Sequence, residues 1–172
     1  NLLAPSGLTF YGGLILAAIG ILWYSYRKGI NLYHLVDAVA PVLMIAYAVG
    51  RIGCHVSGDG DWGIFNSAFM LDAQGSIIAA PDGQFTRTLT ENQGFAQYLT
   101  GEFGSIDKIP HKSFSGPGFL PNWLWAYNYP HNVNEVGTPI AGCTGNYCNQ
   151  LNPLVFPTPL YEIIACSLLF LV

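Results

Sequence analysis

The feature that most constrains this chain is an uncharged, apolar run in its first part. Residues 1–26 contain no charged side chain, and their centre reads LTFYGGLILAAIGILWY. About 20 apolar residues cross the ~30 Å hydrocarbon core of a bilayer as an α-helix. A secretory signal peptide carries its basic residues before a shorter apolar core. Here Arg27 and Lys28 follow the run, so the sequence predicts a transmembrane helix.

Two further apolar runs indicate a mainly α-helical, polytopic membrane protein. Residues 35–54 are interrupted only by Asp37 and Arg51, and a third run starts near Pro159 and reads LYEIIACSLLFLV. That third run is too short to cross a bilayer, so we expect it to be the start of a third span in a fragment of a longer protein. The predicted organisation is two transmembrane helices with a glycine-arginine motif in 1–63, a mixed, loop-rich insertion in 64–156, and a truncated helix in 157–172.

The few charges indicate a topology and exclude one class of partner. Charged residues make up 9% of the chain, against about 25% in ordinary soluble domains. Arg27 and Lys28 lie between the first two spans, and the positive-inside rule places that connection in the cytoplasm. Residues 64–156 are then extracytoplasmic. The net charge of −4 leaves no basic surface for nucleic acid.

The long insertion predicts a small subdomain or a functional lid, because it exceeds the usual length of a loop. Residues 71–85, LDAQGSIIAAPDGQF, predict two short strands around polar turns. Residues 94–106, GFAQYLTGEFGSI, predict a short amphipathic helix. The aromatic stretch 122–130, NWLWAYNYP, is either a buried loop core or a surface at the lipid headgroups. The residues alone leave both alternatives open.

Two cysteines of the insertion predict a disulfide. Cys143 and Cys148 stand in CTGNYC, and an oxidising compartment outside the membrane would permit the bond. The alternatives are two free thiols or a zinc site, and the spacing lacks an obvious second ligand pair for zinc. Cys166 lies in the third apolar run, where we expect it to be a packing residue.

Arg51 is the strongest candidate for a functional residue. A charged side chain within a membrane segment is costly and indicates function by default. Arg51 stands in AVGRIGCHVSGDGDWG, residues 48–63, where an apolar helix runs into a glycine-rich polar stretch. Glycines permit tight turns and close approach of a ligand, and a guanidinium binds phosphate with two donors. The alternative is an arginine that snorkels to the interface from a helix end.

The polar residues after Arg51 add to this hypothesis. His55 shares a helix face with Arg51 if the helix continues, and it serves either proton transfer and hydrogen bonding or only a polar interface. Asp59 and Asp61 can orient Arg51 or bind a metal. Two carboxylates are too few for a metal site, so we favour pairing with Arg51 and predict no metal.

Two other clusters complete the candidate site. The first is Tyr11-Gly12-Gly13 near the outer end of the first predicted helix. Paired glycines usually serve close helix packing, and the functional alternative is approach of a lipid, with Tyr11 facing the site. The second is FPTPLYE, in which prolines mark a helix start and Glu162 predicts a charged partner, with Arg51 as the candidate. Under the predicted topology all clusters lie at the outer boundary, which indicates one site.

These motifs together resemble the prolipoprotein diacylglyceryl transferase family. Residues 50–63, GRIGCHVSGDGDWG, are similar to its Gly-Arg-x-Gly-(Asn or Cys) signature closed by glycine. Residues 8–15, LTFYGGLI, and 156–162, FPTPLYE, resemble its (His or Tyr)-Gly-Gly-Leu and Leu-Tyr-Glu motifs. The long insertion resembles a variant found in the Bacteroidetes. The resemblance implies a multi-pass protein of the bacterial inner membrane that uses no cofactor.

The implied reaction transfers a diacylglyceryl group from phosphatidylglycerol to the lipobox cysteine thiol of a prolipoprotein. A thioether forms and glycerol phosphate leaves. A base or a positive field must generate the thiolate, and Arg51 matches the family's phosphate-contacting arginine. Tyr11 stands where many members have an essential histidine, and a phenol with a pKa near ~10 is a poor base. With Tyr11, Arg51 and His55 as catalytic candidates, the predicted substrate-binding residues are Arg51, Gly12, Gly13, Gly53, Asp59, Gly63, Tyr161 and Glu162.

Two other classes of protein remain as alternatives. The first is a transporter or channel fragment that uses Arg51 and Glu162 as gating or substrate charges; inverted repeats would favour it, and none is visible. The second is a structural membrane protein, which leaves the glycine-arginine stretch unexplained. The family's second important arginine would lie beyond Val172, so this segment alone is expected to be inactive.

Overall fold

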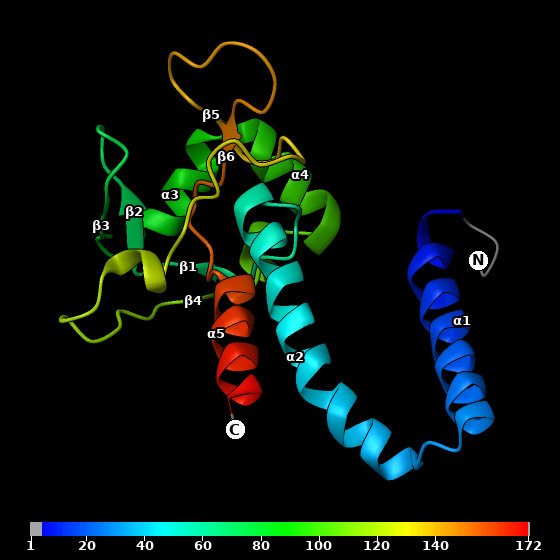
Figure 1. The fold of residues 1–172 in the computed structure, drawn as a ribbon. Coiled ribbons are helices and arrows are strands. Elements are labelled where there is room, and N and C mark those ends of the chain that lie inside the picture. The colour runs from blue at the N-terminus through cyan, green and yellow to red at the C-terminus, as the bar shows by residue number, and fades with distance from the viewer. Residues whose placement is uncertain (1–4, 172) are drawn as a thin grey trace.

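The computed structural model describes residues 5–171, with side chains described from residue 12 onward. The described chain is mainly helical, with three small two-stranded sheets (Figure 1). The helices are α1 (Pro5–Lys28), α2 (Leu32–Ser57), α3 (Gln84–Glu91), α4 (Gln93–Phe103) and α5 (Thr158–Phe170), with 3₁₀ turns η1 (Ile106–Lys108) and η2 (Asn122–Leu124). The strands are β1 (Phe65–Asn66), β2 (Phe69–Leu71), β3 (Ile77–Ala79), β4 (His111–Lys112), β5 (Thr138–Pro139) and β6 (Asn149–Gln150).

Helices α1 and α2 form an antiparallel pair joined by a tight turn. Gly29 adopts a positive φ of 64° in that turn. The Asn31 side chain then caps α2 by accepting a hydrogen bond from the Tyr33 amide at 2.9 Å, which satisfies one of the free amides at a helix start. The first two apolar runs are therefore helical, as predicted. Figure 1 shows that the two helices diverge away from the turn.

Within the described residues, α2 is the one helix long and apolar enough to cross a membrane. Its apolar side chains point outward, and Val42, Leu43 and Val49 are each more than half exposed. An apolar helix surface of this kind is typical of a helix solvated by lipid. The structure thus supports a membrane protein, while two full spans remain a prediction.

Helix α5 packs along the C-terminal part of α2, and the two lie side by side in Figure 1. Its first turn contains Pro159, a position where the missing amide donor costs nothing. The third apolar run is therefore helical from Thr158, close to the predicted start. This packing brings the FPTPLYE motif to the C-terminal end of α2.

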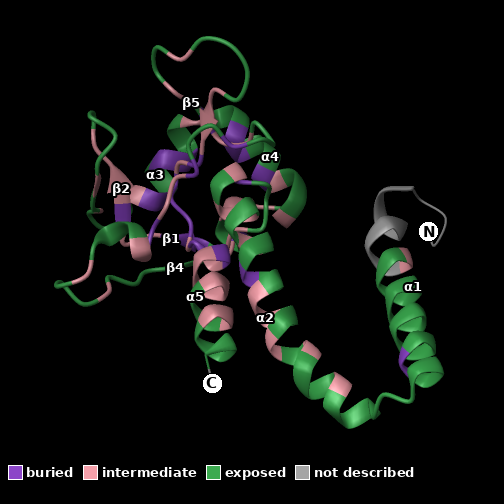
Figure 2. Cartoon of the chain, viewed as in Figure 1, coloured by how far each residue is buried: buried purple, intermediate pink, exposed green. Residues whose placement is uncertain are grey.

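The insertion folds around its own hydrophobic core. Figure 2 shows the buried positions gathered there, while α1 and α2 are mostly exposed. The main core joins strands, helices and loops that lie far apart in the sequence. Its buried residues are Phe65, Phe85, Leu89, Phe95, Ala96, Leu99, Ile109, Tyr129, Leu151 and Val155.

The sequence predicted part of the local structure of the insertion. β2 and β3 pair in antiparallel register around a turn at Asp72, and α4 covers most of the predicted amphipathic helix. Residues 84 and 85, at the end of this stretch, begin α3. Gly83, with φ 78°, turns the chain there, and the spacing of Phe85 and Leu89 buries one helical face.

The aromatic stretch 122–130 is partly buried and partly exposed. Ala126 and Tyr129 are buried at 0% and 2% exposure and belong to the core. Trp123, in η2, is 46% exposed. The second half of the stretch is therefore a buried loop core, and the first half lies at the surface.

The strands β5 and β6 carry the two cysteines beyond their ends. Cys143 and Cys148 form a disulfide, with Cα atoms 5.6 Å apart, which is within the range that a disulfide can bridge. The bond closes an exposed loop that lies at the far side of the insertion from α5 (Figure 1).

Candidate functional site

The end of α2 positions the candidate site. Gly58 ends the helix in the left-handed conformation, with φ 60°, and its amide donates to the Cys54 carbonyl at 3.0 Å. A Cβ atom at this position would lie 2.8 Å from the Cβ of Asn132. Glycine is therefore required twice here, by its backbone conformation and by close packing. The chain can then turn back so that the next residues reach the helix that it has just left.

Arg51 is held by two carboxylates. Its Nε lies 2.6 Å from Oε2 of Glu162, an ion pair without hydrogen-bond geometry, and its Nη2 donates to Oε1 of Glu162 at 3.0 Å. Its Nη1 donates to Asp61 in a very short contact. The Arg51 side chain is 14% exposed, against 37% for Glu162 and 54% for Asp61. The predicted pairing of Arg51 with Glu162 is confirmed, and Asp61 is its outer partner.

Tyr47 adds a third contact to this ion pair. Its hydroxyl donates to Oε2 of Glu162 at 2.5 Å, and its ring lies 5.9 Å from the Arg51 guanidinium carbon, within cation–π range. The sequence analysis missed Tyr47. The signal was its position four residues before Arg51, which places both on one face of α2.

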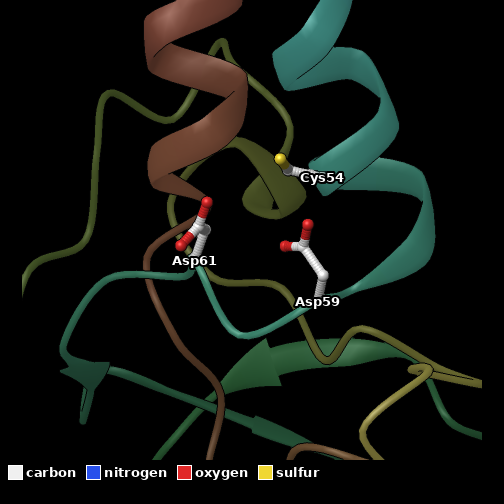
Figure 3. A group of neighbouring side chains, drawn as sticks. All are labelled: Cys54, Asp59 and Asp61. Carbon is white, nitrogen blue, oxygen red and sulfur yellow. The ribbon is translucent and has the colours of Figure 1, made fainter. Parts of the chain in front are cut away.

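Three potential metal ligands also lie near Arg51. The ligand atoms of Cys54, Asp59 and Asp61 all lie within 4.8 Å of one another. Figure 3 shows both carboxylates, from the loop after α2, turned toward the sulfur of Cys54. The Nη1 of Arg51 contacts two of the three, with Cys54 Sγ at 3.5 Å. The guanidinium therefore supplies a positive charge next to Cys54 and Asp61.

His55 lies one turn beyond Arg51, next to the rings of two tyrosines. Because α2 continues to Ser57, Arg51 and His55 share a face, as predicted for a continuous helix. The Nδ1 of His55 is hydrogen-bonded to the Tyr129 hydroxyl at 3.2 Å, and the ring centroids of Tyr127 and Tyr129 lie 5.2 Å and 5.5 Å away. Burial raises the pKa of Tyr129, which keeps its phenol protonated.

The start of α5 is joined to the glycine-rich stretch by backbone contacts. The amide of Gly63 donates to the Phe156 carbonyl at 2.9 Å, and a Cβ atom at Gly63 would lie 2.8 Å from Cγ2 of Thr158. The Thr158 hydroxyl donates to the Asp61 carbonyl at 2.8 Å. Gly63 thus permits the close approach that fixes Asp61 beside Arg51.

The hydroxyl of Tyr161 is engaged in a hydrogen bond to the backbone. It donates to the Leu124 carbonyl in η2 at 2.6 Å. Gly53 faces open space, since no described atom lies within 4 Å of a Cβ built there. Of the residues predicted to bind substrate, Tyr161 and Gly63 therefore have packing roles in this structure, while Gly53 makes no close contact with the described residues.

The structure brings two of the three predicted clusters together. Gly12 and Gly13 meet no described atom within 4 Å of a built Cβ, and Figure 1 shows the upper part of α1 standing away from α2 and α5. The side chain of Tyr11 lies outside the described side chains. The expectation of one site formed by all three clusters is therefore not met, because α1 approaches α2 closely only near their connecting turn.

The fold and the site define a helical membrane protein with a paired arginine at one end of a membrane-length helix. The family described as prolipoprotein diacylglyceryl transferase matches this sequence over residues 2–172. The chain belongs to that family.

Curated relatives match part of this chain. A phosphatidylglycerol–prolipoprotein diacylglyceryl transferase of Leptospira interrogans is 43% identical over 63 residues, which cover 37% of this chain and 20% of the relative. A protein of the same name from Streptococcus pyogenes serotype M5 is 47% identical over 51 residues, covering 30% of this chain and 20% of the relative. The chain therefore aligns with about a fifth of each relative's length. No solved structure matches it.

Proposed function

We propose that this protein transfers the diacylglyceryl group of phosphatidylglycerol to the lipobox cysteine thiol of prolipoproteins, the first step of bacterial lipoprotein maturation. The thiolate forms a C–S bond to the glyceryl carbon, the C–O bond to phosphate breaks, and glycerol phosphate leaves with the electron pair. Membership of the family and the names of the two relatives support this reaction. The single observation that carries it here is Arg51, a partly buried cation at the end of a membrane-length helix, paired with two carboxylates.

Arg51 is the proposed phosphate ligand. In this structure Glu162 binds the Nε and Nη2 edge, and the more exposed Asp61 occupies Nη1. A phosphodiester that takes the place of Asp61 keeps the guanidinium oriented by Glu162. The leaving phosphate then develops its charge beside a fixed cation, an arrangement that stabilises a transition state strongly in a site that excludes water.

His55 is the proposed proton acceptor for the thiol. The hydrogen bond between its Nδ1 and the Tyr129 hydroxyl fixes the ring, and such a second contact sets the tautomer of a histidine. A thiol with a pKa near ~8.5 needs a base or a positive field at neutral pH. Tyr11 is the competing candidate, and Tyr11→Phe separates the two. A large loss of rate with unchanged phosphatidylglycerol binding assigns the proton or a transition-state hydrogen bond to Tyr11.

The proposal places the protein in the inner membrane as a multi-pass protein, with residues 64–156 on the outer side. Arg27 and Lys28 at the α1–α2 turn support a cytoplasmic connection, and the disulfide is consistent with an oxidising compartment. Cysteine substitutions at Lys28 and Lys108 test this in intact cells. An impermeant maleimide is expected to label position 108, and labelling of position 28 alone would reverse the topology.

A direct assay tests the activity. Full-length protein in phosphatidylglycerol vesicles is expected to move labelled diacylglyceryl from phosphatidylglycerol to a lipobox peptide. The same peptide with serine in place of the lipobox cysteine is the control and is expected to stay unlabelled. No transfer by a folded, full-length preparation would overturn the proposed function, and labelling of the serine peptide would overturn the thioether chemistry.

A further inference from the structure

Residues 113–125, here named the aromatic loop, expose apolar side chains in an unusual concentration for the surface of a folded insertion. Phe119 is 84% exposed, Trp123 46% and Phe114 40%. The sequence has no Asp, Glu, Lys or Arg from residue 113 to residue 134. Isolated exposed apolar residues are ordinary, whereas several on one uncharged segment indicate an interaction surface.

The base of the aromatic loop is fixed while its tip projects. The amide of buried Asn66 donates to the carbonyls of Phe114 and Trp125, each at 2.9 Å, and so joins both ends of the loop. The rings of Phe114 and Trp125 meet edge to face with centroids 5.3 Å apart. At the tip, the Leu120 amide donates to the Pro117 carbonyl at 3.0 Å in a turn. The exposed Phe119 is therefore carried by a loop whose two ends are held in place.

Contacts with α5 and with the residues just before it fix the position of the aromatic loop along the axis of α5. Tyr161, in the first turns of α5, donates to the Leu124 carbonyl at 2.6 Å, and the rings of Phe114 and Phe156 lie 6.5 Å apart. Tyr161 directly precedes Glu162, the partner of Arg51. Figure 1 shows the aromatic loop, in yellow-green, level with the first turns of α5 and away from the β5–β6 end of the insertion. The loop thus lies at the depth of the Arg51 site.

The chemistry at this depth fits a lipid surface. Tryptophan and other aromatic side chains are favoured at the headgroup region, where one end can be apolar and the other hydrated. An open, largely apolar groove of about 560 Å³ separates the base of the loop from α5, with Lys112 at its edge. A lysine beside anionic headgroups adds an electrostatic attraction.

We propose that the aromatic loop is a membrane-interface anchor that inserts Phe119 and Trp123 among the lipid headgroups of the leaflet bordering the Arg51 site. The anchor holds the insertion over the membrane at a fixed height. This proposal depends on α2 crossing the membrane and does not depend on the transferase activity.

Depth-resolved fluorescence tests the anchor. The full-length protein, with the free cysteines Cys54 and Cys166 replaced by serine, would carry Phe119→Cys labelled with an environment-sensitive fluorophore. Gln74→Cys is the matched control, since it is equally a solvent-exposed loop position but lies in the β2–β3 turn. Both proteins are reconstituted in phosphatidylethanolamine–phosphatidylglycerol vesicles, with and without acyl-chain bromines near the headgroup.

The expected result is a blue-shifted emission at position 119 that brominated lipid quenches at least twofold and aqueous iodide leaves nearly unchanged. Position 74 is expected to show the reverse. Equal iodide quenching at the two positions would overturn the proposal. Shielding from iodide without quenching by brominated lipid would also overturn it, because the occupant would then be protein, such as a second copy of this chain.

Discussion

Arg51 on α2 and Glu162 on α5, 111 residues apart in the sequence, form a two-point ion pair with contacts of 2.6 Å and 3.0 Å. Tyr47 donates to the same carboxylate. The pair joins the two helices where their apolar surfaces end and the insertion begins. It fixes the guanidinium in one orientation, which a single flexible arginine on a helix surface would not have.

Glu162→Gln is expected to loosen both the helix contact and the site. The neutral amide cannot compensate the charge of Arg51, and we expect a loss of about 1–2 kcal/mol in stability, because the pair is only partly buried. Transfer activity should fall at least tenfold as Arg51 loses its orientation. Thermal unfolding in detergent and the transfer assay measure the two effects. Glu91→Gln, at an exposed position, is the control, and equal behaviour of the two variants would contradict the role given to Glu162.

Asp61→Asn tests whether Asp61 occupies the phosphate position. If phosphatidylglycerol replaces Asp61 at Nη1, removal of the competing charge should lower the KM for phosphatidylglycerol several-fold with a small change in kcat. Asp82→Asn removes a carboxylate at an exposed position of the insertion and should change neither constant. A drop in kcat with KM unchanged would instead show that Asp61 acts in the transition state.

Asn66→Ala should destabilise the insertion. Asn66 is fully buried, and its side chain makes four hydrogen bonds: it donates to two carbonyls and accepts from the amides of Ala68 and Phe114. Buried backbone groups left without partners cost about 1–3 kcal/mol. Denaturant unfolding measures this loss, and limited proteolysis should cut the released aromatic loop faster. Asn146→Ala, at an exposed position, should leave both measurements unchanged.

The elements that follow from local pattern were predictable. Apolar runs of helical length predicted the positions of α1, α2 and α5, and the turn chemistry after β2 predicted its hairpin with β3. The partner of Glu162 was also predictable, because a carboxylate in an apolar segment requires a nearby cation and Arg51 was the available one. The family followed from three short motifs, the first two of which agree with it in order and spacing.

Other features depend on contacts that no local pattern records. His55 meets Tyr129, 74 residues later in the chain, and only the fold of the insertion brings them together. Asp61, rather than Asp59, pairs with Arg51 because Thr158 and Gly63 fix the intervening backbone against α5. The separation of α1 from the site was likewise not predictable, since Gly12 and Gly13 show the same pattern whether or not a helix packs against them.

The most direct test of the account is the rate of transfer by Arg51→Ala in the full-length protein, measured with labelled phosphatidylglycerol and a lipobox peptide. Loss of a charge-assisted contact to the leaving phosphate should reduce the rate by roughly 30- to 1,000-fold, equivalent to about 2–4 kcal/mol. Arg51→Lys should recover only part of the rate, because an ammonium lacks the planar pair of donors. Near-normal transfer by a well-inserted Arg51→Ala protein would contradict the account and leave Arg51 as an ion pair that only joins α2 to α5.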